Sequence, residues 1–203
     1  MTGAPLWVKV CGVRRRADVA AAEDAGADAI GLVLADSSRR VTPEEAARLA
    51  ASTPLETFIV TVDAHPAELL DLAAFTGVGG VQPHGASADG AAVAAIRAGL
   101  TVLRPVRVDG PVDFARIPSD QIPLLDSPHP SLHGGTGAPI DPDLVPAVAR
   151  PWVLAGGMGP GTVGEAVARL RPWGVDASSG LESRPGVKDP GLIKAYVEEA
   201  RRA

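Results

Sequence analysis

The sequence predicts an α/β fold, a single (β/α)8 barrel that occupies residues 1–203. Short apolar stretches typical of buried parallel strands alternate with helix-like stretches along the whole chain. Eight such pairs fit into 203 residues, near the lower size limit of a TIM barrel. A doubly wound open sheet would usually carry a G-x-G-x-x-G loop after its first strand, where this chain has Val10-Cys11-Gly12-Val13. No linker or shift in composition suggests a second domain.

The first four strand–helix pairs are indicated by apolar runs followed by helix start and stop signals. Gly26 ends the first helix. Thr42, Pro43 and Glu44-Glu45 give the second helix an N-cap, a proline at its first position and an acidic first turn. Strands are expected at 6–10, 28–34, 57–62 and 78–82. Helices are expected at 16–25, from 43 onward, at 66–75 and over an Ala-rich stretch that ends near 99.

The last four pairs follow the same alternation with a weaker fifth helix. Strands are expected at 101–108, 122–126, 152–155 and 175–177. Residues 112–117 offer at most a short, irregular helix, whereas helices are expected at 141–150, 161–170 and 190–202.

The composition excludes several classes of protein. Hydrophobic residues make up 46% of the chain and charged residues 21%, an ordinary globular balance. The net charge of −5 and the lack of a basic stripe with aromatic residues argue against a nucleic-acid partner. Arg14-Arg15-Arg16, the densest basic run, is expected to be a solvated surface.

Neither a metal nor a cofactor is expected. The single cysteine, Cys11, rules out an intramolecular disulfide framework and a cysteine-rich zinc site. The four histidines lack H-E-x-x-H spacing: His65, His84, His129 and His133. The chain shows no secretory leader and no apolar run long enough to span a bilayer, so a soluble, cytoplasmic protein without membrane contact is expected.

Functional groups of such a barrel lie at the carboxyl ends of the strands. Asp126 ends the apolar run of the sixth strand and is followed by the glycine-rich stretch 134–137. Gly156-Gly157 and Ser178-Ser179-Gly180 follow strands seven and eight, where barrels of this kind commonly bind phosphate through backbone amides. Residues 182–189 leave room for a short extra helix. An acid beside phosphate-binding loops predicts an enzyme that acts on a phosphorylated small molecule.

These segments together resemble the phosphoribosylanthranilate isomerase family of tryptophan biosynthesis, in order and from end to end. The resemblance is weakest between about 86 and 121. It is carried by 8–12 (VKVCG), 25–31 (AGADAIG), 38–44 (SRRVTPE), 81–85 (VQPHG), 124–127 (LLDS), 134–137 (GGTG), 154–157 (LAGG), 174–183 (GVDASSGLES) and 185–190 (PGVKDP).

The resemblance implies a TIM barrel that catalyses an Amadori rearrangement of an aminoaldose to an aminoketose. It implies that Asp126 is the general acid that opens the furanose ring and that Cys11 is the general base that removes the C2′ proton. An ordinary aspartate is almost wholly ionised at neutral pH, and an ordinary thiol is almost wholly protonated, so both groups need a supporting environment. Lys9 lies on the same side of its strand as Cys11 and is a candidate for lowering the pKa of the thiol.

The remaining site residues also follow from the resemblance. Arg39 is expected to bind the anthranilate carboxylate through paired hydrogen bonds, and the adjacent Arg40, which stands where tyrosine is more common, is the alternative. Gln82 and His84 are expected to line the aromatic end of the pocket. Backbone groups are expected to bind the rest of the substrate, including its phosphate, at Gly135, Gly156, Gly157, Ser178, Ser179 and Gly180.

Two departures and two rival interpretations remain. Pro83 and Ala138 replace the usual leucine and lysine, which bears on affinity and specificity rather than reaction type.

The related histidine-pathway isomerase is a rival, but it uses aspartate where this chain has Cys11. The second rival is a non-catalytic phosphate-binding barrel or scaffold, which would not need both Cys11 and Asp126. Ala-rich outer helices favour a monomer, with a homodimer as the alternative.

Overall fold

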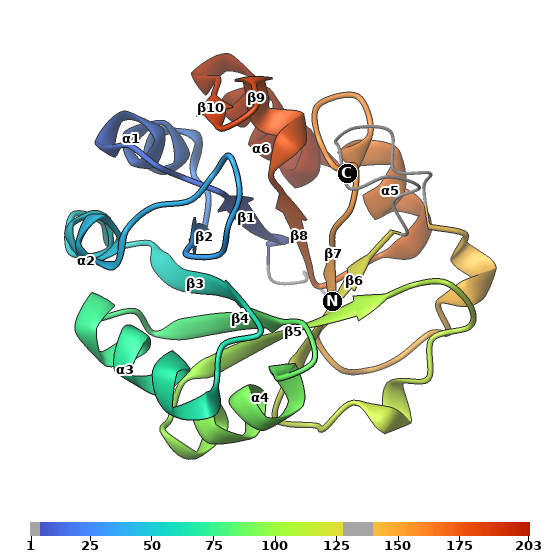
Figure 1. Ribbon diagram of the computed structural model, residues 1–203. Coiled ribbons are helices and arrows are strands. Elements are labelled where there is room, and N and C mark those ends of the chain that lie inside the picture. The colour runs from blue at the N-terminus through green and yellow to red at the C-terminus, as the bar shows by residue number, and fades with distance from the viewer. Residues whose placement is uncertain (1–4, 128–139) are drawn as a thin grey trace.

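In the computed structural model, which describes residues 5–127 and 140–203, eight parallel strands close into a barrel with helices around it (Figure 1). Each strand pairs with the next, and β1 pairs with β8 to close the ring. The TIM barrel prediction is therefore confirmed. The strands are β1 (Trp7–Cys11), β2 (Ala29–Val33), β3 (Glu56–Val62), β4 (Gly80–His84), β5 (Thr101–Arg107), β6 (Ile122–Asp126), β7 (Val153–Leu154) and β8 (Gly174–Ala177).

The helices begin and end at residues with recognisable cap chemistry. Thr42 and Glu45 form a capping box with Pro43 at the first helical position, as the sequence predicts. Gly26 and Gly77 adopt left-handed conformations, with φ of 79° and 70°, at the ends of their helices. The α-helices are α1 (Arg16–Ala25), α2 (Pro43–Ala50), α3 (Pro66–Thr76), α4 (Ala88–Arg97), α5 (Val163–Leu170) and α6 (Pro190–Arg202).

The barrel interior is built in three layers along the strand direction. The layer nearest the amino ends of the strands is apolar: Trp7, Ala29, Phe58, Leu103, Leu124 and Val153, with Ala155, which follows β7, packed in the same cluster. The middle layer is polar and contains Lys9, Gln82 and Asp176 in contact with one another. The layer at the carboxyl ends contains Cys11 with Val33 and Val60. Alternation along β1 therefore places Trp7, Lys9 and Cys11 on one inner line.

Of two expected helices, the one at 141–150 is wrong and the short, irregular one at 112–117 is confirmed. Residues 141–150 contain only the 3-10 turn η2 (Pro142–Leu144) instead of a helix. Pro146 cannot donate a backbone hydrogen bond inside a helix and disfavours a helical conformation at the preceding residue. After β5, the expected short helix is the 3-10 turn η1 (Phe114–Arg116).

The extra helix expected at 182–189 is also wrong. These residues form a small antiparallel hairpin, β9 (Glu182–Arg184) and β10 (Val187–Lys188), which reverses at Gly186 with φ of 76°. A 3-10 turn, η3 (Ser179–Leu181), precedes the hairpin instead. The hairpin therefore leaves the barrel wall at the carboxyl end of β8, next to the expected phosphate loops.

Candidate active site

Cys11 lies at the carboxyl end of β1 with its side chain inside the barrel. It is only 7% exposed and packs with Val33 and Val60. Its register partner on β2 is Gly31, and a Cβ on that glycine would lie 2.7 Å from Cys11 Sγ. The glycine therefore provides the space that the thiol occupies, a feature that the sequence analysis did not identify.

A buried ion pair lies one pleat below the thiol. Lys9 Nζ donates to Asp176 Oδ2 at 2.8 Å and to Gln82 Oε1 at 2.9 Å, and the lysine is completely buried. Burial opposes protonation of Lys9, but Asp176 and Cys11 outweigh it and raise the pKa of the lysine above its ordinary value. The middle layer thus holds an ammonium group directly beneath Cys11.

The electrostatic surroundings of the thiol act in opposite directions. Burial raises the pKa of Cys11, and the charge of Asp176 adds to that effect. The cations Lys9 and Lys188 oppose it. The predicted influence of Lys9 on the thiol thus has the expected sign, although burial is the larger effect.

Gln82 connects the ion pair to His84 at the mouth of the barrel. Its amide nitrogen lies 3.1 Å from His84 Nε2, while its oxygen accepts from Lys9. The imidazole therefore accepts at Nε2 and is neutral in this arrangement. Burial, together with Lys9 and Arg104, lowers the pKa of His84 to about 4. Both residues were expected at the site, and the structure places them in contact on β4, with Gln82 in the middle layer and His84 at the carboxyl end of the strand.

Asp126 ends β6, and the loop after β7 passes directly beside it. A Cβ on Gly156 would lie 2.7 Å from Asp126 Oδ1 and 2.2 Å from Ser127 Oγ. Gly156 also has φ of 83°, which favours glycine. Only glycine at this position allows the backbone to approach the carboxylate so closely.

The loops after β7 and β8 pack backbone to backbone. A Cβ on Gly180 would lie 2.2 Å from the carbonyl oxygen of Met158. Gly156 and Gly157 have φ of 83° and 65° in the first loop. Ser178 precedes η3, whose first amides have no acceptor within so short a helix. Two amide-rich turns thus lie side by side at the expected phosphate position. Gly135 lies outside the described residues.

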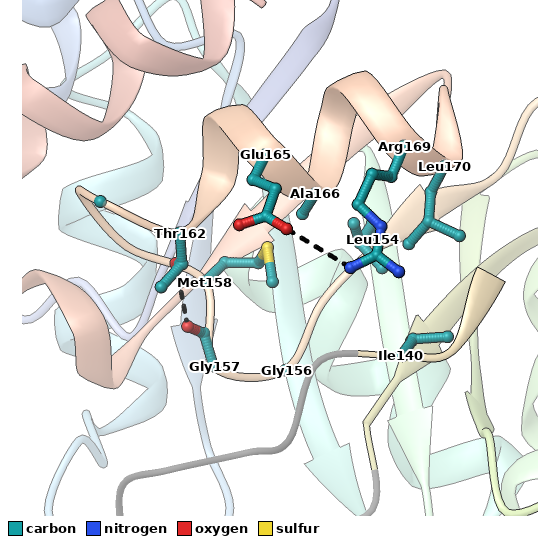
Figure 2. A pocket seen from close by; sticks show the side chains of 11 residues that line it. Ile140, Leu154, Gly156, Gly157, Met158, Thr162, Glu165, Ala166, Arg169 and Leu170 are labelled. Atoms are coloured by element: carbon teal, nitrogen blue, oxygen red, sulfur yellow. Dashed lines mark hydrogen bonds and ion pairs between the residues drawn. The ribbon is translucent and has the colours of Figure 1, made fainter.

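A cavity of about 110 Å³ lies beside the loop after β7, between that loop and α5 (Figure 2). Leu154, Met158 and Leu170 line it, and Gly156 and Gly157 form part of its wall. Glu165 and Arg169 form an ion pair of 3.4 Å at its edge.

Arg39 is bound side-on by a glutamate from the hairpin. Its Nε and Nη2 donate to the two carboxylate oxygens of Glu182 at 2.7 and 2.9 Å. Lys188 Nζ also donates to Glu182, at 3.1 Å. Arg40, in contrast, is exposed. Sequence reasoning identified Arg39 but missed Glu182, Lys188 and Asp176, although all three stand inside motifs that it singled out.

The described residues contain no cluster of three or more His, Cys, Asp or Glu side chains arranged to hold a metal ion. Among the same residues, no helix is long and apolar enough to cross a membrane.

Comparison with known proteins places this chain clearly. Residues 8–199 match the family described as N-(5'phosphoribosyl)anthranilate (PRA) isomerase. The chain belongs to this family. The N-(5'-phosphoribosyl)anthranilate isomerase of Symbiobacterium thermophilum is 39% identical over 222 aligned positions, which cover 97% of this chain and 98% of that relative.

Solved structures of phosphoribosylanthranilate isomerases share the fold. The enzyme from Thermotoga maritima superposes with a TM-score of 0.85 and 31% identity, covering 98% of this chain and 100% of that one. A phosphoribosylanthranilate isomerase in complex with reduced 1-(o-carboxyphenylamino)-1-deoxyribulose 5-phosphate gives a TM-score of 0.81 at 30% identity, with the same coverage. Family membership and fold thus agree with the resemblance found in the sequence.

Proposed function

We propose that this protein is an N-(5-phosphoribosyl)anthranilate isomerase of tryptophan biosynthesis. It converts the aminoaldose to 1-(2-carboxyphenylamino)-1-deoxyribulose 5-phosphate. The observation that carries the proposal is the position of Cys11 and Asp126 at the carboxyl ends of β1 and β6, within a chain that belongs to this isomerase family over almost its whole length.

Asp126 acts as the general acid in the first step. Its proton goes to the ring oxygen of the ribose, the C1′–O bond breaks, and the nitrogen lone pair forms the C1′=N bond of an iminium ion. The backbone of Gly156 passes close to this carboxyl group and limits the space around it.

Cys11 acts as the general base in the second step. Its thiolate takes the C2′ proton, and the electron pair of that C–H bond neutralises the iminium to give an enolamine, which tautomerises to the ketone. Lys9 supports this step because a cation beneath the sulfur stabilises the thiolate relative to the thiol.

The other site residues bind the substrate. Gly135, Gly156, Gly157 and the Ser178-Ser179-Gly180 turn contact it through the backbone, with the amides of the loops after β7 and β8 taking the phosphate. Arg39 binds the anthranilate carboxylate, and Gln82 and His84 line the aromatic end. The reaction needs no metal or cofactor. Residues 1–203 act as one catalytic domain. The protein is a monomer, which sedimentation tests, and it is cytoplasmic, which cell fractionation tests.

The test is turnover of freshly generated N-(5-phosphoribosyl)anthranilate, followed by loss of its fluorescence. Cys11→Ser and Asp126→Asn should each lower kcat by about 10²- to 10⁴-fold, the usual contribution of a general acid or base. Both variants should still bind the reduced product analogue, which separates lost chemistry from lost folding. Wild-type protein that binds the analogue but turns over only the histidine-pathway aminoaldose would contradict the proposal.

A further inference from the structure

The pairing of Arg39 with Glu182 leaves one edge of the guanidinium unused. Glu182 takes Nε and one N–H of Nη2, and a guanidinium has five N–H donors in one plane. Three donors therefore remain, two on Nη1 and one on Nη2. Within residues 5–127 and 140–203, Arg39 Nη1 has no hydrogen-bond acceptor. A second carboxylate can therefore bind through the Nη1–Nη2 edge without displacing Glu182.

Glu182 is itself fixed by contacts that do not involve Arg39. Lys188 Nζ donates to Oε1 at 3.1 Å, and the amide of Gly186 donates to Oε2 at 3.2 Å. The Glu182 side chain is only 4% exposed. Burial opposes its ionisation, but Arg39 and Lys188 outweigh burial and lower the pKa of Glu182. Arg39 therefore faces an ionised and immobilised partner.

The stem of Arg39 lies over the residue that follows the catalytic thiol. A Cβ on Gly12 would lie 2.7 Å from Arg39 Cδ and 3.0 Å from Ser178 Oγ. The Arg39 side chain still keeps 26% of its surface exposed. Its methylenes are thus packed against the mouth of the barrel, and part of the side chain remains accessible to a ligand.

We propose that Glu182 is a positioning residue that holds Arg39 side-on, so that the free edge of the guanidinium receives the aromatic carboxylate of the substrate. This inference rests on the proposed function, in which Arg39 binds that carboxylate. An unpaired arginine loses substantial side-chain entropy when it binds a ligand, whereas Arg39 has already lost it in the free enzyme. Lys188 offsets the repulsion between the two carboxylates that then share one guanidinium.

The experiment compares two ligands that differ only in the carboxylate. The first is reduced 1-(o-carboxyphenylamino)-1-deoxyribulose 5-phosphate, and the second is the same compound made with aniline in place of anthranilate. Calorimetry gives the dissociation constant of each ligand for wild type, Glu182→Gln and Arg39→Met. The carboxylate-dependent ratio is the dissociation constant of the aniline compound divided by that of the compound with the carboxylate. Glu198→Gln, an isosteric change at an exposed glutamate on α6, is the matched control.

Glu182→Gln should lower the carboxylate-dependent ratio about tenfold, because glutamine offers the guanidinium one neutral acceptor oxygen in place of two charged ones, and its NH2 group cannot accept. Arg39→Met should abolish the dependence, and the control should not change it. In turnover, Glu182→Gln should raise KM more than it lowers kcat. Should the glutamine variant fail to fold, Glu182→Asp provides the same comparison, since its shorter carboxylate cannot bind Arg39 side-on in the same position.

The outcomes separate the two proposals. A ratio that falls in Arg39→Met but stays constant in Glu182→Gln overturns the positioning role and keeps Arg39 as the carboxylate ligand. A ratio that rises in Glu182→Gln shows that Glu182 competes with the ligand, which also overturns it. A ratio that does not respond to Arg39→Met overturns the assignment of Arg39 itself.

Discussion

Lys9 Nζ lies 2.8 Å from Asp176 Oδ2, and this fully buried contact joins neighbouring strands β1 and β8 one pleat below Cys11. An isolated ammonium group would be neutralised in such a place. Asp176 keeps Lys9 charged, and the charge of Lys9 then acts on the thiol. The carboxylate therefore influences Cys11 in two ways, directly by repulsion and indirectly through the lysine.

Lys9→Met should make the Cys11 thiolate harder to form. Without the ammonium, burial and Asp176 both favour the thiol, so alkylation by iodoacetamide at pH 8 should slow at least about tenfold. Because Cys11 is the only cysteine, the reaction of the whole protein reports on this one group. Lys194→Met, at an exposed lysine on α6, is the control. An alkylation profile identical to wild type would refute the electrostatic role of Lys9.

Asp176→Asn should destabilise the protein. Removing one partner of a buried ion pair leaves the ammonium of Lys9 without a counter-charge or forces its neutralisation, and such a loss typically costs about 3–5 kcal/mol of unfolding free energy. Urea unfolding at pH 7 measures the loss. Asp89→Asn removes the partner of Arg104 at an exposed carboxylate and should cost about 1 kcal/mol or less. Equal losses in the two variants would show that the buried pair contributes no more than the surface pair.

His84 should make stability fall as the solution becomes more acidic. Its pKa in the folded state is about 4, below the ordinary value of 6.5, so the unfolded chain binds the proton more tightly. The contribution of neutral His84 is complete above about pH 6.5 and decreases as the pH falls toward 4, by roughly 2–3 kcal/mol in total. Unfolding at pH 7.0 and 4.5 measures the change, and His84→Gln should remove this part of it. Titration of the His84 imidazole by NMR near 6.5 would contradict the prediction.

Gly156→Ala should impair catalysis beyond the cost of its backbone conformation. The new methyl group would collide with Ser127 Oγ and Asp126 Oδ1 and displace Asp126, the proposed general acid. We expect a loss of kcat/KM of about 10²-fold, a typical result of displacing a reacting group by 1 Å. Gly161→Ala is a close control, because Gly161 has φ of 85° but no atom within 4 Å of its Cβ position. Similar losses in the two variants would assign the effect to φ alone.

Gly31→Ala should displace Cys11, the proposed general base, in the same manner. Its methyl group would lie 2.7 Å from Cys11 Sγ, so either the thiol moves or the strands separate. We predict at least about a tenfold loss of kcat. Overpacking should also lower the free energy of unfolding by about 1–3 kcal/mol. Gly79→Ala, where the Cβ has open space, should leave both quantities near wild type. Full activity in Gly31→Ala would show that the thiol position is not critical.

Much of the fold was predictable because local signals and tertiary structure agree. The helices 16–25 and 190–202 and the strand 122–126 have the expected bounds. Caps and glycine stops encode such boundaries within a few residues. The helix expected at 141–150 does not form, because Pro146 lacks a backbone N–H and disfavours a helical conformation at the residue before it. The hairpin at 182–189 depends on long-range contacts with Arg39, which no local pattern reports.

The positions of Cys11 and Asp126 at the ends of their strands were predictable, but the residues that surround and support them were not. Alternation along β1 was enough to place Lys9 below Cys11. The partners of Lys9 come from β4 and β8, and their side chains meet it only when the barrel closes. The same is true of Gly31 and Gly156, whose importance lies in space that they leave empty for other residues. The sequence motifs include these positions, but the physical role of each residue depends on contacts that form only when the barrel closes.

The apolar layer at the amino ends of the strands has a consequence for how ligands leave. Trp7 stacks on Trp173 with ring centroids 5.2 Å apart and meets Phe58 edge-on at 6.0 Å, so aromatic rings fill the end of the barrel opposite Cys11. These rings block the passage of a ligand along the barrel axis. The aminoketose must therefore leave by the opening through which the aminoaldose entered. Substrate and product therefore share one opening. Product must dissociate before the next substrate molecule can bind, so inhibition by product is competitive with substrate.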